Sequence, residues 1–129
     1  MKRLNITGYR KEYLVKNMKF NYDELNDLLY VYKKDSSVYS NVMIGEFHLE
    51  LNKNGEIVGI EILKASEILS EFDIPQEILQ HIDKAELKVV IRNNSLLVSL
   101  MIHGLDQDKS ATITMNNLES PIMHAIASA

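Results

Sequence analysis

The sequence contains no cysteine and no tryptophan, and it has only two prolines and five glycines among its 129 residues. Without cysteine the chain cannot form disulfides, thiolate nucleophiles, zinc fingers or iron–sulfur clusters. So few glycines also leave no glycine-rich loop that would cradle a phosphate group. With 46% hydrophobic and 25% charged residues, the composition is that of a globular protein, and the length suits one domain.

Long apolar runs are missing as well. No stretch reaches the length of a membrane span, and the first residues lack the apolar core of a signal peptide, so we expect a cytoplasmic protein with no membrane contact. The formal net charge is −4, and the positive charge is concentrated near the amino terminus. The rest of the chain is therefore acidic and would repel a phosphate backbone, so we do not expect nucleic-acid binding.

Residues 1–17 have a local excess of positive charge. Their only acidic residue is Glu12, and their basic residues are Lys2, Arg3, Arg10, Lys11 and Lys16. A short run of this kind is typical of a solvated edge. We interpret residues 1–17 as a basic amino-terminal extension and residues 18–129 as a single α+β domain.

Two stretches of alternating apolar residues, 47–51 and 56–63, flank Asn54-Gly55. Because both residues tolerate positive φ, this pattern predicts a β-hairpin with Asn54 and Gly55 as the two central turn residues. In that register Leu51 faces Val58, and the large apolar residues share one face. The opposite face then holds Glu46, His48, Glu50, Gly59 and Glu61.

A second hairpin is predicted around Asn93-Asn94, with Ile91 opposite Leu96. The reverse face of this hairpin still contains Val90, Leu97 and Met101, so we expect another layer or another subunit to cover it. Further strands are expected at residues 20–22, 28–32 and 110–115.

Between the hairpins the apolar spacing becomes helical. It predicts two short helices, with Ser66 capping the first and Pro75 in the first turn of the second, which runs to about Asp83. Residues 121–127 fit a strand beside residues 111–115, the reading we favour, or a helix that begins at Ser120-Pro121.

These elements predict an α+β fold, mainly antiparallel β in two related layers with a short two-helix connector. Unpaired sheet edges and the second hairpin, which is apolar on both faces, favour a homodimer.

One group of residues suggests chemistry. Glu46, His48 and Glu50 alternate along one strand, and His48 lies opposite Glu61 in the predicted register. An imidazole between carboxylates can hold a divalent metal ion, or act as a base that a carboxylate orients. The simpler interpretation is a solvated strand face with a His48–Glu61 contact. No nucleophile elbow, Walker loop or dinucleotide fingerprint occurs, so we assign no catalytic residue and no cofactor.

Two further features have alternative interpretations. Tyr30, Tyr32 and Tyr39 could form an aromatic platform for a ligand or bases, but at strand spacing among Val and Leu we interpret them as packing residues. Gly59 lies in mid-strand, which indicates a positive φ, a bulge, or a group packed against bare backbone.

Several of these residues also form recognisable motifs. Tyr22-Asp23, Asp27-Leu28-Leu29-Tyr30-Val31 and the pattern Gly-x-x-Val-Gly-x-Glu-Ile-Leu-x-Ala-Ser at residues 55–66 resemble a small family, domain of unknown function 2283. The resemblance covers Met18 to about Leu69, and residues 24–26 depart from the usual spelling. It implies a compact antiparallel β module with no established activity. It also implies a protein-binding role, such as neutralising a toxin-like protein.

Two functions of different classes follow. The first is a non-enzymatic protein-interaction module. The alternative is a protein that binds a small ligand or a divalent metal ion, or a hydrolase, using Glu46, His48, Glu50 and Glu61. A flat, solvated face at these residues favours the first function, and a deep pocket favours the second.

Overall fold

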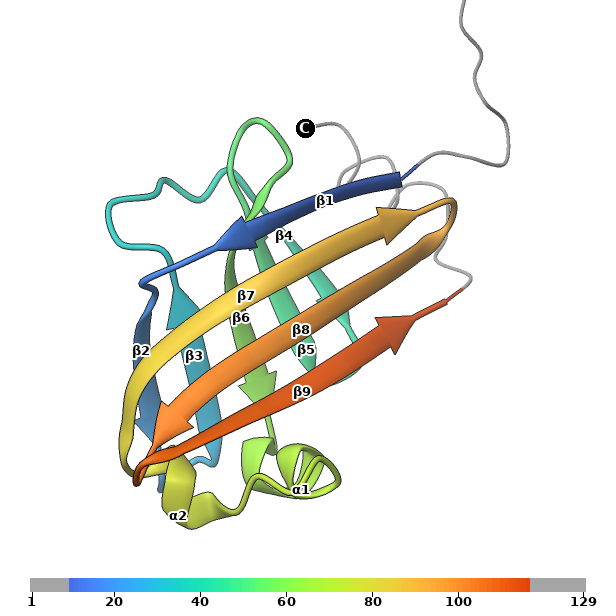
Figure 1. Cartoon of the computed structure of the whole chain (residues 1–129). Helices are drawn as coiled ribbons and strands as arrows, with labels where there is room; N and C mark the ends of the chain where they lie inside the picture. The colour runs from blue at the N-terminus through green and yellow to red at the C-terminus, as the bar shows by residue number, and fades with distance from the viewer. Residues whose placement is uncertain (1–9, 117–129) are drawn as a thin grey trace, which may run out of the picture.

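The computed structural model describes residues 10–116, which form two antiparallel sheets and two short helices (Figure 1). The elements are β1 (Arg10–Val15), β2 (Lys19–Asp23), β3 (Leu28–Tyr32), β4 (Ser40–Ile44), β5 (Phe47–Leu51), β6 (Ile57–Leu63), α1 (Ala65–Ser70), α2 (Gln76–Leu79), β7 (Ile82–Arg92), β8 (Ser95–Gly104) and β9 (Gln107–Met115).

The four-stranded sheet, here sheet A, has the order β1-β7-β8-β9, and the five-stranded sheet B has the order β2-β3-β6-β5-β4. Figure 1 shows sheet A lying obliquely across sheet B, with both helices at one end of the two layers. The predicted mainly antiparallel fold, in two layers with a two-helix connector, is confirmed. The strand predicted at residues 121–127 lies outside the described residues.

Strand β1 belongs to the segment that the charge pattern assigns to an extension. It pairs with β7 along its whole length, from Arg10 opposite Arg92 to Val15 opposite Leu87. Its side chains alternate, so that Val15 is buried while Arg10 is exposed. Within β1, the charged side chains of Arg10 and Glu12 are therefore on the solvent-facing side of a paired edge strand.

The core fills the space between the inner faces of the sheets, and aliphatic side chains from both layers are fully buried there. Burying one such side chain contributes about 1.5–3 kcal/mol. The buried residues of sheet B include Leu29, Val31, Leu49, Ile60 and Ile62, and those of sheet A include Leu87, Val89, Leu96, Val98 and Leu100. Packing of these two sets holds the layers together.

The first hairpin forms, but its turn differs from the prediction. Asn52 N donates to Glu56 O at 2.9 Å, so the loop has three residues, 53–55, and of these only Gly55 has positive φ, 83°. A three-residue loop with a left-handed final residue is a common hairpin connection. The side chain of Asn52 closes it, because its Oδ1 accepts from Asn54 N at 2.9 Å and Glu56 N at 3.0 Å.

The register of this hairpin also shifts once. Phe47 lies opposite Ile62 and His48 opposite Glu61, as predicted, but Leu51 pairs with Ile57 instead of Val58. Val58 is thus the extra residue of a β-bulge. The predicted pairing of Leu51 with Val58 is wrong because a bulge adds one residue to β6.

The second hairpin has the predicted register, with Ile91 opposite Leu96. The helices are shorter than predicted, because α2 ends at Leu79 and Ile82 already begins β7. Pro75 is the N-cap of α2 and precedes its first turn. The chain from residue 10 to 116 contains no helix that is both long and apolar enough for a membrane crossing.

Ser66 does not cap α1. The N-cap is Lys64, whose backbone is left-handed with φ 53° and ψ 43°. Ser66 lies inside the helix, where its backbone N and its Oγ both donate to the carboxylate of Asp27. A residue outside the helix, on the turn between β2 and β3, therefore replaces the predicted cap.

Tyr13 of β1 joins the two layers. Its hydroxyl accepts a hydrogen bond of 2.7 Å from the backbone N of Ile57, where β6 begins. Burial raises the pKa of Tyr13 to about 12, although the hydrogen bond from Ile57 acts in the opposite direction. One side chain thus satisfies a backbone donor beside the bulge in the other sheet.

We predict that Tyr13→Phe lowers the free energy of unfolding by about 1–3 kcal/mol, because it leaves the N–H of Ile57 without a partner. Urea denaturation measures the loss. The native pKa of Tyr13 lies above the ordinary value of 10.0, so above pH 10 the unfolded chain loses the phenol proton before the native protein does. The stability that Tyr13 contributes is therefore complete below pH 10 and declines as the pH rises toward about 12. Equal midpoints at pH 7, or a difference that does not narrow above pH 10, would contradict this role.

Candidate functional site

The outer face of sheet B carries two rows of mostly polar and aromatic residues that cross all five strands. The first row is Asn21, Tyr30, Glu61, His48 and Met43, and the second is Lys19, Tyr32, Gly59, Glu50 and Asn41. Directly opposed residues on neighbouring strands have their Cβ atoms about 5 Å apart. The two rows therefore form one continuous surface, which we call the tyrosine face.

Tyr30 and Tyr32 stack on each other at the centre of this face. Their ring centroids lie 4.6 Å apart and the ring planes differ by 18°. The hydroxyl of Tyr30 donates to Glu50 Oε1 at 2.5 Å. Burial, followed by the hydrogen bond to Glu50, raises the pKa of Tyr30 well above its ordinary value, so the hydroxyl stays protonated. The rings pack against one another on the outer surface, away from the core.

Gly59 makes the contact between Tyr30 and Glu50 possible. It lies between Tyr32 and Glu50 in the second row, and its φ is not positive. A Cβ at this position would overlap Glu50 Oε1. Of the three predicted reasons for this glycine, a group packed against its bare backbone is therefore the correct one. The side chain of Glu50 in β5 crosses β6 at Gly59 and reaches Tyr30 in β3. The bulge lies one residue earlier, at Val58.

We predict that Gly59→Ala displaces the Glu50 carboxylate and lowers the free energy of unfolding by about 1 kcal/mol, the usual contribution of one hydrogen bond. In a Tyr30→Phe background the same change should be neutral or slightly stabilising, because no hydrogen bond is left to lose and alanine restricts the unfolded chain. Urea midpoints of the four proteins form a double-mutant cycle. Additive effects would show that Gly59 serves some purpose other than this contact.

The residues predicted as a metal site do not assemble into one. His48 Nδ1 lies 3.3 Å from Glu61 Oε1, and both side chains are about one-third exposed, at 27% and 31%. Glu50 instead turns toward Tyr30, and Glu46 lies in the turn between β4 and β5. Within residues 10–116, no three His, Asp or Glu side chains are grouped so that they could hold a metal ion. What the arrangement provides is a His–Glu contact and a Tyr–Glu contact.

Residues of the two family-like motifs meet at one end of sheet B. Asp27 accepts from the Tyr22 hydroxyl at 2.6 Å, from Ser66 N at 2.9 Å and from Ser66 Oγ at 2.7 Å. Partial burial alone would raise the pKa of Asp27, but these hydrogen bonds outweigh it and lower the pKa below 3.8. Gln76 Nε2 also donates to the Tyr22 hydroxyl at 2.8 Å. This cluster joins the β2–β3 turn to both helices. The sequence indicates it only in that Tyr22, Asp27 and Ser66 all belong to the two motifs.

His103 has no partner that is evident from the sequence. In the structure its Nδ1 lies 2.6 Å from Asp83 Oδ1, at the register shift near the start of β7. The hydrogen bond to Asp83 raises the pKa of His103. The histidine lines a shallow hollow of about 360 Å³ on sheet A. The His103–Asp83 pair is a solvent-exposed contact on sheet A, whereas the tyrosine face is on sheet B.

The centre of the tyrosine face lines none of four hollows found among residues 10–116. These hollows have volumes of about 280 to 530 Å³, and their linings do not include Tyr30, Tyr32 or Glu50. Asn21, at the end of the first row, lines the smallest of them. A polar and aromatic surface outside these hollows can accommodate a broad partner, whereas a small molecule needs a pocket that encloses it.

Comparisons with known proteins match this part of the chain. Residues 19–66 match a family model described as "Protein of unknown function (DUF2283)". An uncharacterized protein of Methanocaldococcus jannaschii is 28% identical over 93 residues, which cover 71% of this chain and 78% of the relative. No solved structure matches the chain.

The matched segment begins with β2 and ends at the start of α1, so it contains the whole of sheet B. Strands β1, β7, β8 and β9 lie outside it. The resemblance to the domain of unknown function 2283 family is thus confirmed over residues 19–66, the segment that forms sheet B and carries every residue of the tyrosine face.

Proposed function

We propose that this protein is a non-enzymatic interaction module that binds a protein partner through the tyrosine face. The stacked pair of Tyr30 and Tyr32, held by Glu50, carries the proposal. Tyrosine offers a large contact area with few rotatable bonds. When its ring is already fixed in the free protein, binding loses less conformational entropy and more of the contact energy appears as affinity.

The composition of the face also suits a protein surface as partner. Tyrosine and methionine are enriched where proteins contact one another. Met43 ends the first row and is 57% exposed, and Tyr39, immediately before β4, is 76% exposed. Polar groups of Lys19, Glu61 and Asn41 surround the rings. An aromatic centre with a polar border is the usual anatomy of a protein interface.

The alternative function needs a pocket or a set of ligands at the same residues. Tyr30, Tyr32 and Glu50 line none of the four hollows described above. Within residues 10–116, the four residues of the metal alternative have only the contact between His48 and Glu61. The face therefore favours a broad partner. A toxin-like protein, the class that the family resemblance implies, would be a partner of this kind.

A comparative capture experiment from native lysate tests this function. The baits are the wild type, a Tyr32→Ala/Met43→Ala variant of the tyrosine face, and a Leu97→Ala/Met101→Ala control on the outer face of sheet A. We expect a stoichiometric protein partner with the wild type and the control, and at least about tenfold weaker binding by the face variant, since buried tyrosines often contribute 2 kcal/mol or more to an interface. Titration calorimetry with the purified partner measures the loss, and circular dichroism verifies that each bait is folded.

Equal capture of the same partner by all three baits would remove the tyrosine face from the proposal. Native mass spectrometry of the wild type that finds a bound small molecule, lost in the face variant, would favour the alternative function instead.

A further inference from the structure

The outer edge of sheet A at β9 is unpaired within the described part of the chain. The sheet order places β8 on one side of β9, and among residues 10–116 no strand lies on the other. In Figure 1 this strand, drawn in red, forms the rim of the front sheet. An unpaired strand presents a row of backbone donors and acceptors that another strand can complete.

The hairpin between β8 and β9 fixes which backbone groups point outward. Its loop consists of Leu105 and Asp106, with φ values of 52° and 59°, and Gly104 lies opposite Gln107. Two successive positive φ values identify a type I′ turn, whose closing pair is hydrogen-bonded. Hydrogen-bonded pairs then alternate along the strand. The residues whose N–H and C=O groups point away from β8 are therefore Asp108, Ser110, Thr112 and Thr114.

Within residues 10–116 this edge lacks the usual protection against pairing, which is supplied by charge, proline or a covering segment. Lys109 is charged and bonds to Asp73 at 3.1 Å, but Ser110–Met115 contains neither charge nor proline. The edge of sheet B at β2 is different, because β7 of sheet A lies close to it. Just before β2, Met18 N donates to Ala85 O of β7 at 3.0 Å. Strands β1 and β4 are shorter than β9.

We propose that β9 pairs antiparallel with β9 of a second copy of this chain, about a two-fold axis that passes beside Thr112. Thr112 then faces Thr112 of the second copy, and Ser110 faces Thr114. Each of these opposed residues has its free N–H and C=O directed at the partner strand. The two copies of sheet A become one continuous eight-stranded sheet, with four strands contributed by each copy.

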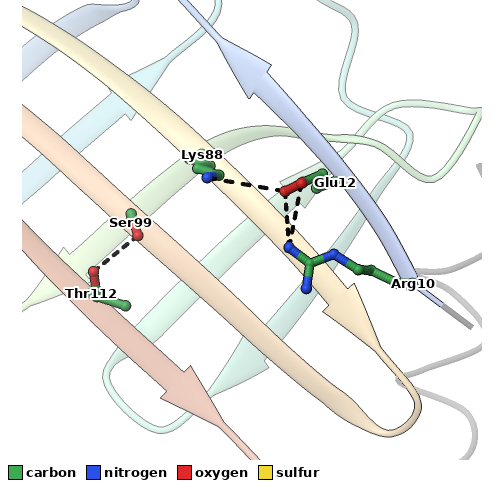
Figure 2. A network of polar contacts seen from close by, with 5 residues as sticks. All are labelled: Arg10, Glu12, Lys88, Ser99 and Thr112. Atoms are coloured by element: carbon green, nitrogen blue, oxygen red, sulfur yellow. Dashed lines mark hydrogen bonds and ion pairs between the residues drawn. The ribbon is translucent and has the colours of Figure 1, made fainter. Parts of the chain in front are cut away.

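The side chains fit this register on both faces. On the inner face, Ala111 lies opposite Ile113 of the second copy, a small residue against a large one, and Lys109 lies opposite the uncharged Met115. On the outer face, opposed Ser and Thr hydroxyls form favourable cross-strand pairs. Figure 2 shows the Thr112 hydroxyl directed at Ser99, 2.9 Å away, so this side chain lies over the sheet and leaves the backbone edge open.

A shift of the register by two residues in one direction would place Asn116 opposite Asp106, which lies in the β8–β9 turn and not in a strand. A shift in the other direction would extend the pairing past Asn116. The register centred on Thr112 instead places Asp108 opposite Asn116, so it uses the whole described edge without opposing like charges. This interface is in the other sheet from the tyrosine face, and it does not depend on the proposed function.

Light scattering and sedimentation of the full chain test the proposal. We expect a wild-type mass of twice 14.8 kDa. Thr112→Pro removes one outward N–H that no strand within residues 10–116 pairs with, and it should raise the dimer dissociation constant at least about tenfold. Asn41→Pro is the matched control. Asn41 lies three residues before Ile44, which closes the β4–β5 turn, so its N–H also points away from the neighbouring strand, toward an edge that no strand occupies within residues 10–116. This control should remain dimeric.

A pair of charge variants tests the register itself and does not require a proline. Thr112→Arg and Thr112→Glu should each be monomeric, because the axis brings two like charges together. Mixed in equal amounts, they should form a heterodimer, since the opposite charges then meet at the axis.

The proposal is overturned by a monomeric wild type at the highest soluble concentration. It is equally overturned by a dimer that Thr112→Pro and Thr112→Arg leave unchanged. Hydrogen exchange separates a further case: a monomer whose Ser110, Thr112 and Thr114 amides are protected would show that another part of the same chain, such as residues 121–127, occupies the edge.

Discussion

Everything else in this structure depends on covering the apolar inner face of sheet B. Leu29, Leu49, Ile60 and Ile62 are all completely buried, and sheet A provides the cover. A sheet with one apolar face is stable only when that face packs on another layer. The family match ends at residue 66, so the strands β7, β8 and β9 that supply most of this cover lie beyond it. The matched segment of this chain is one half of a two-layer fold.

Committing the aliphatic residues of sheet B to the inner face leaves its outer face for polar and aromatic groups. One glycine then decides how they are arranged. Because Gly59 has no side chain, Glu50 can cross β6 and hold Tyr30 beside Tyr32. The bulge at Val58 lies next to that crossing, and Tyr13 from sheet A binds the backbone just before it. The core, the strand irregularity and the tyrosine face are thus connected over a few residues of β6.

What could be predicted from the sequence was local. The contact between His48 and Glu61 follows from the alternation on both sides of one turn, and the structure has it. The contact between Tyr30 and Glu50 requires the strand order β3-β6-β5, which no local pattern contains. The turn of the first hairpin was missed because the side chain of Asn52 selects a three-residue loop. Asp27 likewise acts on Ser66 from a distant turn, where no helix-capping rule would place it.

The edge strands were the least predictable elements. Strand β1 alternates charged residues with Tyr13 and Val15, and its charges dominate the composition of its segment. Strand β4 is short. It begins with two polar residues and ends with three consecutive apolar ones, Val42, Met43 and Ile44, so it contains no alternation from which a period could be read. Both strands form because a neighbouring strand, β7 or β5, offers them a backbone to pair with. Pairing of this kind is a property of the assembled sheet.

We infer that sheets A and B form one cooperative unit around a shared core. Native-state hydrogen exchange at increasing denaturant measures it most directly, because it reports the free energy of opening for each strand. The account predicts that amides of β6 and β8 exchange only through global unfolding, with the same free energy and the same denaturant dependence. Exchange of the β7 and β8 amides at a markedly lower free energy, while β3, β5 and β6 remain protected, would show that sheet B is stable without its cover and would contradict the account.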